Sequence, residues 1–343
     1  MGVNLGTAVG YLDLDTSKFT MGFKDALSSV EKFKNGTGGV SGMLKGVGNS
    51  LASTGKDLTL KVTTPIVGLG AAAVKTSASL ESSLSKVKAI SGATGKDMDN
   101  LKAKAIEMGA KTKFSATEAS DAFTYMAMAG WDAKSMMDGI DGIMNLAAAD
   151  GLDLATTSDI VTDALTAFGL QASDSAHFAD VLAKASSSAN TNVSMLGESF
   201  KYVAPVAGSL GYSVEDTATA LGLMANSGIK ASQAGTSLRA ALTRMVKPTD
   251  EAEAIMERYH LTLQNSDGTM KSLGDVMDML RSNMGGLSEA EQSQAASALF
   301  GQEAMSGMLA IINSSEGDYN KLTDAINNAD GTAENMANTM QDN

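Results

Sequence analysis

The sequence lacks cysteine and holds only two histidines and three prolines among its 343 residues. Without cysteine, neither a disulfide framework nor a thiolate metal site can form. The histidines, His177 and His260, have no second histidine at the spacing that metal ligands use, so we interpret both as surface or helix-packing residues. The scarcity of proline, together with 35 glycines and 5% aromatic residues, favours small-residue helices that end at glycine.

Long hydrophobic runs and targeting signals are also missing. The longest apolar run, Pro65–Val74, has 10 residues and is too short to span a bilayer as a helix. The amino terminus has neither the basic region nor the apolar region of a secretory signal. We therefore expect no signal peptide.

The short motifs of common enzymes are absent as well. The sequence contains no dinucleotide-binding glycine pattern, no P-loop, no zinc-protease helix motif and no nucleophile elbow. Carboxylates are frequent, but Glu118, Asp121, Asp138 and Asp141 lie where solvated helix faces and first helical turns favour acidic residues. We predict that the chain is not an enzyme, that it has no catalytic, cofactor-binding or metal-binding residues, and that it uses no cofactor.

Charge is distributed unevenly along the chain. Residues 1–113 carry 15 lysines against 9 acidic residues, whereas residues 114–343 carry 11 basic against 30 acidic residues. The lysine-rich part is compatible with contact to nucleic acid or to a lipid surface. Because no aromatic residues are interleaved for base stacking, we favour a solvated helix face and leave nucleic-acid contact open.

The clearest local pattern is the stretch Ser115–Trp131. Ser115 and Glu118 have the spacing of a capping box, in which each side chain satisfies the other residue's amide group. Gly130 is placed to end the helix, because a left-handed residue without a Cβ carries little strain. Between them, one apolar stripe with helical spacing is formed by Ala119, Ala122, Phe123 and Met126.

The same pattern returns 98 positions later, at Ser213–Ile229. Over 30 aligned positions starting at Ser115, six are identical. The identities fall on the cap, the stripe and the stop, which are the positions that define a packing helix. The repeat therefore favours an array of antiparallel helical hairpins.

The chain is predicted to be mostly α, as an array of short antiparallel helical hairpins with glycine stops. Two β elements are expected beside the helices. One is a short N-terminal strand at Thr7–Leu14, where apolar residues alternate, and the other is a small β-hairpin near 260–271, around the turn Asn265–Gly268. The predicted segments are an N-terminal strand plus helix (1–39), an Ala/Gly-rich basic helical segment (40–113), a compact helical core with the repeat (114–247), a helical region with the hairpin (248–330) and the start of a further helix (331–343).

Methionine is frequent on the apolar stripes of the predicted helices. These side chains are expected either to fill the core, which we favour, or to form an adaptable surface for a partner helix. The residues concerned are Met126, Met128, Met136, Met137, Met144, Met195 and Met224.

Several long stretches, in one order, resemble the N-terminal region of tail tape-measure proteins of long-tailed phages and prophages, in the minor tail protein family. Together they cover nearly the whole chain and are far more specific than any short motif. They are residues 58–101, 114–154, 202–242, 286–312 and 330–340.

The resemblance implies a structural role in the virion. Such proteins occupy the tail lumen, set tail length during tube polymerisation and leave before or with the DNA during infection. The implied partners are tail tube proteins, tail tip or hub proteins, tail assembly chaperones and further copies of the chain, as a trimer or hexamer. The implied locations are the virion tail lumen and, during assembly, the host cytoplasm, with contact to the host membrane left open.

One departure from the family concerns length. A tape-measure protein usually continues into a long helical ruler, whereas this chain stops just after a helix begins at Thr332. Even as one continuous helix, its residues would reach only about 515 Å. We therefore expect either the head segment of a longer product or a truncated or processed form.

Two other functions remain open on the sequence. A membrane-active pore or DNA-passage element would use residues 62–87, whose small residues suit tight helix packing in a membrane. A cell-wall hydrolase, which some tape-measure proteins carry elsewhere, is the third alternative, and no residue of this segment supports it.

Overall fold

A computed structural model describes residues 64–341 of the chain, with side chains described from residue 77 to residue 340. The predicted N-terminal strand at Thr7–Leu14 lies outside these residues. The chain divides into two compact units, Met1–Ser82 and Ser83–Asn343. Most of the described residues belong to the second unit.

The described residues form 15 α-helices, one short 3-10 helix and no β-sheet, so the prediction of a mostly helical fold is confirmed. The elements are α3 (Thr64–Ser91), α4 (Lys96–Lys111), α5 (Ala116–Met128), α6 (Ala133–Asp150), α7 (Leu154–Phe168), η2 (Ala172–Asp174), α8 (Ser175–Ser188), α9 (Val193–Ser209), α10 (Val214–Asn226), α11 (Ala231–Val246), α12 (Asp250–Arg258), α13 (Leu273–Met284), α14 (Glu289–Phe300), α15 (Gln302–Ile312), α16 (Glu316–Asn327) and α17 (Thr332–Gln341).

Helix α5 begins and ends as its sequence predicts. The Glu118 amide donates to Ser115 Oγ at 3.2 Å, and the Ser115 amide donates to the Glu118 carboxylate at 2.7 Å. At the other end, Gly130 has a φ of +86° and the Trp131 amide donates back to the carbonyl of Met126 at 3.0 Å. This is the left-handed stop that glycine adopts without strain.

The repeat at a spacing of 98 residues is present in the structure. Both α5 and α10 have 13 residues, and Gly228 stops α10 with a φ of +87°. Each of the six buried positions of α5 has a buried counterpart in α10. The flanking helices keep the same register, because α4 ends at Lys111 and α9 ends 98 positions later at Ser209. The repeated unit therefore includes more than one helix.

Small residues allow neighbouring helices of the unit to approach closely. A Cβ at Gly142 of α6 would lie 2.6 Å from the backbone nitrogen of Ala176 in α8. Beside this contact, Ser175 Oγ donates to the carbonyl of Gly139 at 2.9 Å. Between α9 and α11, Ser199 Oγ likewise donates to the carbonyl of Ala231 at 2.8 Å. The small-residue composition is thus used for close helix pairs rather than for loops alone.

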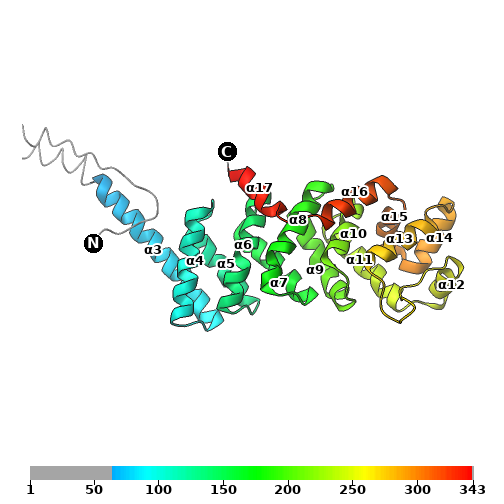
Figure 1. The fold of residues 1–343 in the computed structure, drawn as a ribbon, viewed down its shortest axis with the longest axis horizontal. Coiled ribbons are helices and arrows are strands. Elements are labelled where there is room, and N and C mark those ends of the chain that lie inside the picture. Colours follow the sequence, from blue (N-terminus) through cyan, green and yellow to red (C-terminus); the bar gives the residue numbers. More distant parts are fainter. Residues whose placement is uncertain (1–63, 342–343) are drawn as a thin grey trace, which may run out of the picture. The chain divides into compact units, whose positions relative to one another are not determined.

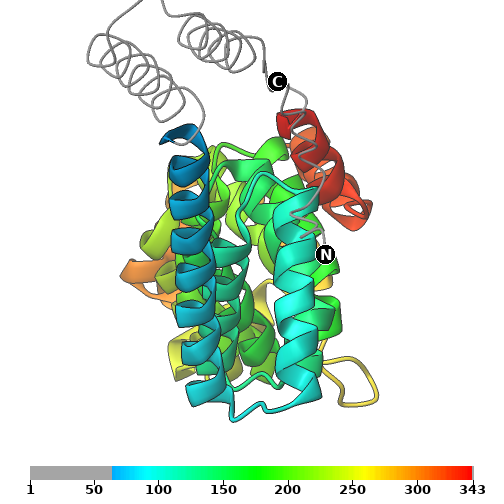
Figure 2. The same ribbon diagram turned by 90° about the vertical axis from the view of Figure 1, so that its left-hand side faces the viewer.

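The order of the helices in space follows their order in the chain, except at the C-terminal end. Helices α4 to α11 succeed one another in the second unit, with α12 to α15 beyond them (Figure 1). Helix α16 then packs against α8 and α10, and α17 packs against α6 and α8. Figure 2 looks along this series and shows the returning α16 and α17, in red, at one edge of it.

Helix α16 lies in the predicted helical region 248–330, but its own bounds were not predicted, although it carries an ordinary start signal. Ser315 Oγ accepts from the Asp318 amide at 3.1 Å, as in the other capped helices. Its buried face includes Leu322, which lies against Gly222 of α10: a Cβ at that glycine would be 2.9 Å from Leu322 Cδ2. Helix α16 therefore covers a face of α10 that has no buried counterpart in α5.

The predicted β-hairpin near 260–271 is wrong as a two-stranded element. Within the described residues it is reduced to one isolated antiparallel bridge, between Gln264 and Met270. The preceding backbone groups are used elsewhere, because the Leu261 amide donates to the Met256 carbonyl of α12 at 2.8 Å. The Thr262 amide faces the sulfur of Met279 at 3.3 Å. A ladder cannot extend where its donors are already taken.

Candidate functional site

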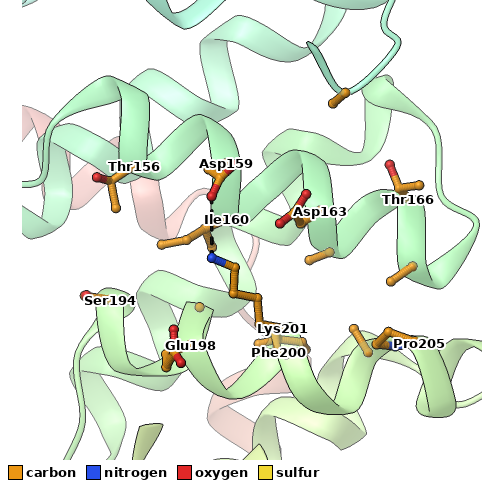
Figure 3. Close-up of a pocket in the computed structure, with 15 residues that line it drawn as sticks. Thr156, Asp159, Ile160, Asp163, Thr166, Ser194, Glu198, Phe200, Lys201 and Pro205 are labelled. Carbon is orange, nitrogen blue, oxygen red and sulfur yellow. Dashed lines mark ion pairs between the residues drawn. The ribbon is translucent and has the colours of Figure 1, made fainter. Parts of the chain in front are cut away.

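The second unit contains a groove between α7 and α9 with a volume of about 550 Å³ (Figure 3). Its floor is apolar and includes Ile160, Phe200 and Ala204. The two helices approach each other closely at glycines. A Cβ at Gly197 would lie 2.6 Å from Ile160, and a Cβ at Gly208 would clash with the carbonyl oxygen of Ala167.

The rim of the groove is predominantly acidic. Figure 3 shows Asp159 and Asp163 on α7 facing Glu198 and Lys201 on α9. Lys201 Nζ lies 3.6 Å from Asp159 Oδ2, and both side chains are about half exposed, so the ion pair contributes little to stability. Burial, and secondarily the charge of Asp159, raises the pKa of Asp163 against the opposing effect of Lys201. Three carboxylates thus surround one cation.

The lining of the groove offers an apolar floor and charged side chains at its rim for binding a partner. No histidine or cysteine is among the described residues that line it, so its Ser and Thr hydroxyls have no imidazole base beside them. An apolar floor with an acidic rim suits an amphipathic helix that carries basic residues. Sequence reasoning missed the groove because it needs the pairing of α7 with α9. One local signal was available, since Asp159 and Asp163 form a like-charge pair four residues apart on a helix.

In a second feature of the unit, an aspartate on one helix accepts hydrogen bonds from backbone amides at the amino-terminal end of another helix. Asp180 of α8 accepts from the amides of Gly331 and Ala333, each at 2.8 Å, at the start of α17. Asp216 of α10 accepts from the Gly274 amide at 3.0 Å, at the start of α13. The helix N-terminus carries unsatisfied donors and partial positive charge, so a carboxylate stabilises it.

A third aspartate, Asp150, joins α6 to α9 in the same way. Burial raises its pKa, and a hydrogen bond from the Val193 amide at the start of α9 opposes that rise. An aspartate in the last turn of a helix opposes that helix's own dipole. An acidic residue at the C-terminal end of α6 is unfavourable for that helix, and this position in the sequence was a signal that Asp150 has a hydrogen-bond donor elsewhere in the fold.

The four carboxylates considered from sequence all have structural partners. Glu118 forms the capping box of α5, and Asp121 accepts from Ser83 Oγ at 2.7 Å. Asp138 pairs with Lys134 on its own helix, and Asp141 pairs with Lys104 of α4 at 3.0 Å. The structure does not bring these four residues together into one site, and the absence of catalytic and metal-binding residues stays a prediction.

The two histidines differ in their surroundings. His177 of α8 has Glu215 Oε1 at 2.5 Å from Nε2 and Asp330 Oδ1 at 3.2 Å from Nδ1. Burial is the largest single effect on the pKa of His177 and lowers it. The hydrogen bonds and charge attraction from the two carboxylates together outweigh burial, so the pKa is raised. His260 instead occupies a turn after α12, with a φ of +53°. Both histidines therefore have the surroundings of packing or surface residues. His177 also links α8 to Glu215 of α10 and to Asp330 in the connection between α16 and α17.

The predicted methionine positions divide between core and surface. Met126, Met136, Met144 and Met224 are buried, as core filling requires. Met128 is 67% exposed and Met195 is 36% exposed. Core filling is therefore confirmed for the four buried methionines, and an adaptable surface for a partner helix stays a prediction for the exposed ones.

Two further features of the described residues bear on the alternative functions. Within residues 64–341, no group of three or more His, Cys, Asp or Glu side chains is placed to hold a metal ion. Across the same part of the chain, no helix combines the length and the apolar character needed to cross a bilayer. These residues include α3, which contains nearly all of the stretch 62–87.

Known proteins provide an independent comparison. The family described as phage-related minor tail protein matches residues 102–301. The tape measure protein of Pneumococcus phage Dp-1 is 38% identical over 341 residues, which is 99% of this chain and 29% of that protein. The probable tape measure protein of Escherichia phage P2 is 28% identical over 250 residues, 72% of this chain and 31% of that protein. The chain thus spans less than a third of either relative, and no solved structure matches it.

Proposed function

Because the chain belongs to the family of phage-related minor tail proteins, we propose that it is the folded head of a tape measure protein, with a structural role in tail assembly and tail-length determination. The single observation that carries this proposal is the similarity to the Dp-1 tape measure protein over 99% of the chain. The site of action is then the phage tail, and the expected partners are other tail components.

The fold supports a docking role for these residues rather than a measuring role. A ruler gains about 1.5 Å of length for every helical residue. In the second unit the helices instead fold back on one another, and α16 and α17 return against α8. Residues packed in this way add little length, so we assign them to attachment and leave measurement to an extended helix elsewhere in the full protein.

The groove between α7 and α9 is the surface that we assign to a tail partner. Its apolar floor and acidic rim favour an amphipathic helix with basic residues. Tail tube, tail tip or hub proteins and tail assembly chaperones are the partners to test. A homo-oligomeric head, as trimer or hexamer, and its presence in the tail lumen of the virion and in the host cytoplasm during assembly belong to the same proposal.

Tail formation in the phage that carries this gene tests the docking role. An in-frame deletion of α4 to α6, made in the otherwise complete gene, is expected to abolish tails or to leave tails of uncontrolled length, seen by electron microscopy. If these residues measured length, the deletion would instead give uniform tails shortened by a fixed amount. Uniform tails of either normal or proportionally reduced length would contradict the proposal.

Charge reversal tests the groove without disturbing the fold. The double variant Asp163→Lys and Glu198→Lys places two cations on the rim, where the side chains are not fully buried. We expect normal helix content and a reduction of tail yield by about tenfold or more, equivalent to about 1.4 kcal/mol of lost binding. Asp324→Lys, an exposed site on α16, is the matched control and is expected to assemble normally. Equal yields from both variants would remove the groove from the proposal.

A further inference from the structure

Helix α17 is attached to the second unit at its amino-terminal end. The amides of Gly331 and Ala333 donate to the two carboxylate oxygens of Asp180 in α8, at 2.8 Å each. The buried side chains of α17 itself are alanines, Ala333 at 2% exposure and Ala337 at 1%. Alanine buries little apolar area, so this contact has a small hydrophobic contribution.

Such a helix depends on its polar attachments. Helices of ten residues are not stable by themselves in water, because nucleation is unfavourable. Helix α17 has 10 residues, and its two long apolar side chains, Met336 and Met340, are not fully buried. Its position on α6 and α8 is therefore sensitive to any change at the connection between α16 and α17, where Asp330 lies.

His177 is the titratable group at that connection. Its ring stands between Glu215 at the start of α10, 2.5 Å from Nε2, and Asp330, 3.2 Å from Nδ1. Ionised carboxylate oxygens only accept hydrogen bonds, so both bonds need a hydrogen on both ring nitrogens. That is the cationic imidazolium. The neutral ring has one N–H and keeps only one of the two bonds.

The geometry decides which bond is lost on deprotonation. The contact with Glu215 is the shorter of the two, and the Glu215 side chain is 24% exposed, whereas Asp330 is 91% exposed. The less solvated carboxylate holds the remaining proton more strongly. The neutral ring then presents a lone pair to Asp330, and the connection to α17 loses an attraction while α8 and α10 stay joined.

The charged groups around His177 are mainly acidic. Helix α8 adds Asp180 one turn along, and α10 adds Asp216 beside Glu215. On α6, Asp138 and Asp141 flank the turn that contacts Ser175, and they pair with Lys134 and Lys104. The other elements packed against α8 are η2, α7, α9, α16 and α17. Their charged residues are Asp174 in η2, Asp159 and Asp163 in α7, Glu198 and Lys201 in α9, Glu316, Asp318, Lys321 and Asp324 in α16, and Glu334 in α17. His177 is the imidazole among these residues, and imidazole is the side chain whose charge ordinarily changes between pH 5 and pH 8.

We propose that His177 is a pH-sensitive latch: its protonated ring holds the connection between α16 and α17 against α8, and deprotonation frees α17 from the face of α6 and α8. The direction follows from linkage. The pKa of His177 is raised above its ordinary value of 6.5 by the two carboxylates, against the opposing effect of burial. The latch is fully present below about pH 6.5 and is lost as pH rises through the raised value.

Hydrogen exchange of the whole chain, followed by mass spectrometry, tests the latch. Protection of the α17 amides is compared between about pH 5.5 and about pH 8.5, after correction for the intrinsic exchange rate at each pH. We expect protection of α17 to fall several-fold across this range while α6 and α8 stay protected. The variant His177→Gln should show low protection of α17 at every pH, since Gln cannot carry the charge.

Two controls keep the result interpretable. His260→Gln changes the other histidine and should leave the pH dependence of α17 as in the unmodified chain. Asp180→Ala removes the carboxylate that holds the first amides of α17 and should release the helix at every pH, which shows that the measurement detects release. The latch is wrong if α17 protection does not change with pH in the unmodified chain, or if His177→Gln retains the same pH dependence.

Discussion

At the scale of single residues, small side chains decide where the helices of this protein touch. Gly142, Gly197 and Gly222 each stand where another helix occupies the space of a Cβ. Their cost in helix propensity, about 1 kcal/mol each relative to alanine, is offset by the close approach that they permit. The glycine content of the chain thus has two distinct uses, at helix stops and at helix contacts.

A pair of glycine substitutions tests the use of glycine at helix contacts. Gly142→Ala places a Cβ about 2.6 Å from the backbone of Ala176, so the helices must move apart. We expect a loss of roughly 1–3 kcal/mol in the free energy of unfolding. Gly317→Ala, in α16, meets open space and should gain roughly 0.4–1 kcal/mol. Urea denaturation followed by circular dichroism measures both, and equal effects of the two changes would refute the packing role of Gly142.

At the scale of helices, the termini are satisfied from two sources. Local caps lie within four residues, such as Ser115 for α5 and Ser288 for α14, and these were predictable from sequence. Distant caps come from Asp150, Asp180 and Asp216, whose partners are up to 153 positions away. Arg281 has the complementary role at the C-terminal end of a helix, where a cation is favourable. Its guanidinium donates hydrogen bonds to Ser314, just after α15. Part of the acidic excess is therefore structural.

The pH dependence of stability distinguishes a buried distant cap from an exposed local one. Burial is the largest cause that raises the pKa of Asp216, so the stability that depends on its neutral form is present below pH 3.8 and is lost as pH rises through the raised value. Asp216→Asn cannot ionise and still accepts a hydrogen bond. We expect this variant to lose less stability than the unmodified chain between about pH 4 and about pH 7.

Asp153→Asn is the matched comparison, with the opposite sign. The Thr156 amide holds the pKa of Asp153 below its ordinary value, so this carboxylate contributes stability above pH 3.8 that is lost on acidification through the lowered value. The variant should be less stable at neutral pH, with the difference closing at low pH. Denaturant midpoints measured across pH are the readout, and parallel pH profiles for the two variants would contradict the assignment.

At the scale of the whole molecule, the second unit combines the 98-residue repeat with two C-terminal helices, α16 and α17, that fold back against α8. The described core residues, from Leu84 to Ala337, all lie in this unit. Helix α10 is buried on more of its surface than α5, its repeat partner, because α16 covers it. The repeat therefore sets the series of helices, and the returning C-terminal helices make its two halves unequal.

A fragment of residues 83–343 tests whether the second unit is independent. We expect it to fold with a melting temperature within about 3 °C of the whole chain. A shorter fragment, 114–343, lacks Leu101, Ala105 and Met108 of α4, which are buried in the unit. That fragment should melt more than about 5 °C lower. Thermal denaturation by circular dichroism measures both, and failure of the longer fragment to fold would contradict the division into units.

The sequence by itself determined the family, the helical class and the starts and stops of helices such as α5 and α10. These features depend on residues within one or two turns of each other, such as Ser115 with Glu118 or Gly130 after Met126, so they survive without knowledge of the fold. The 98-residue repeat was also visible in the sequence, because the identical residues include the N-cap serine, positions of the apolar stripe and the glycine that ends the helix.

Only the tertiary structure decided the features that depend on distant partners. The β-hairpin near 260–271 was lost because α12 and α13 take its first donors, and α16 was found through its packing on α10. The groove between α7 and α9, the distant aspartate caps and the position of His177 between Glu215 and Asp330 all join residues from separate helices. Local sequence fixes backbone hydrogen bonds within a helix, but a side chain's distant partner is fixed only when the helices pack.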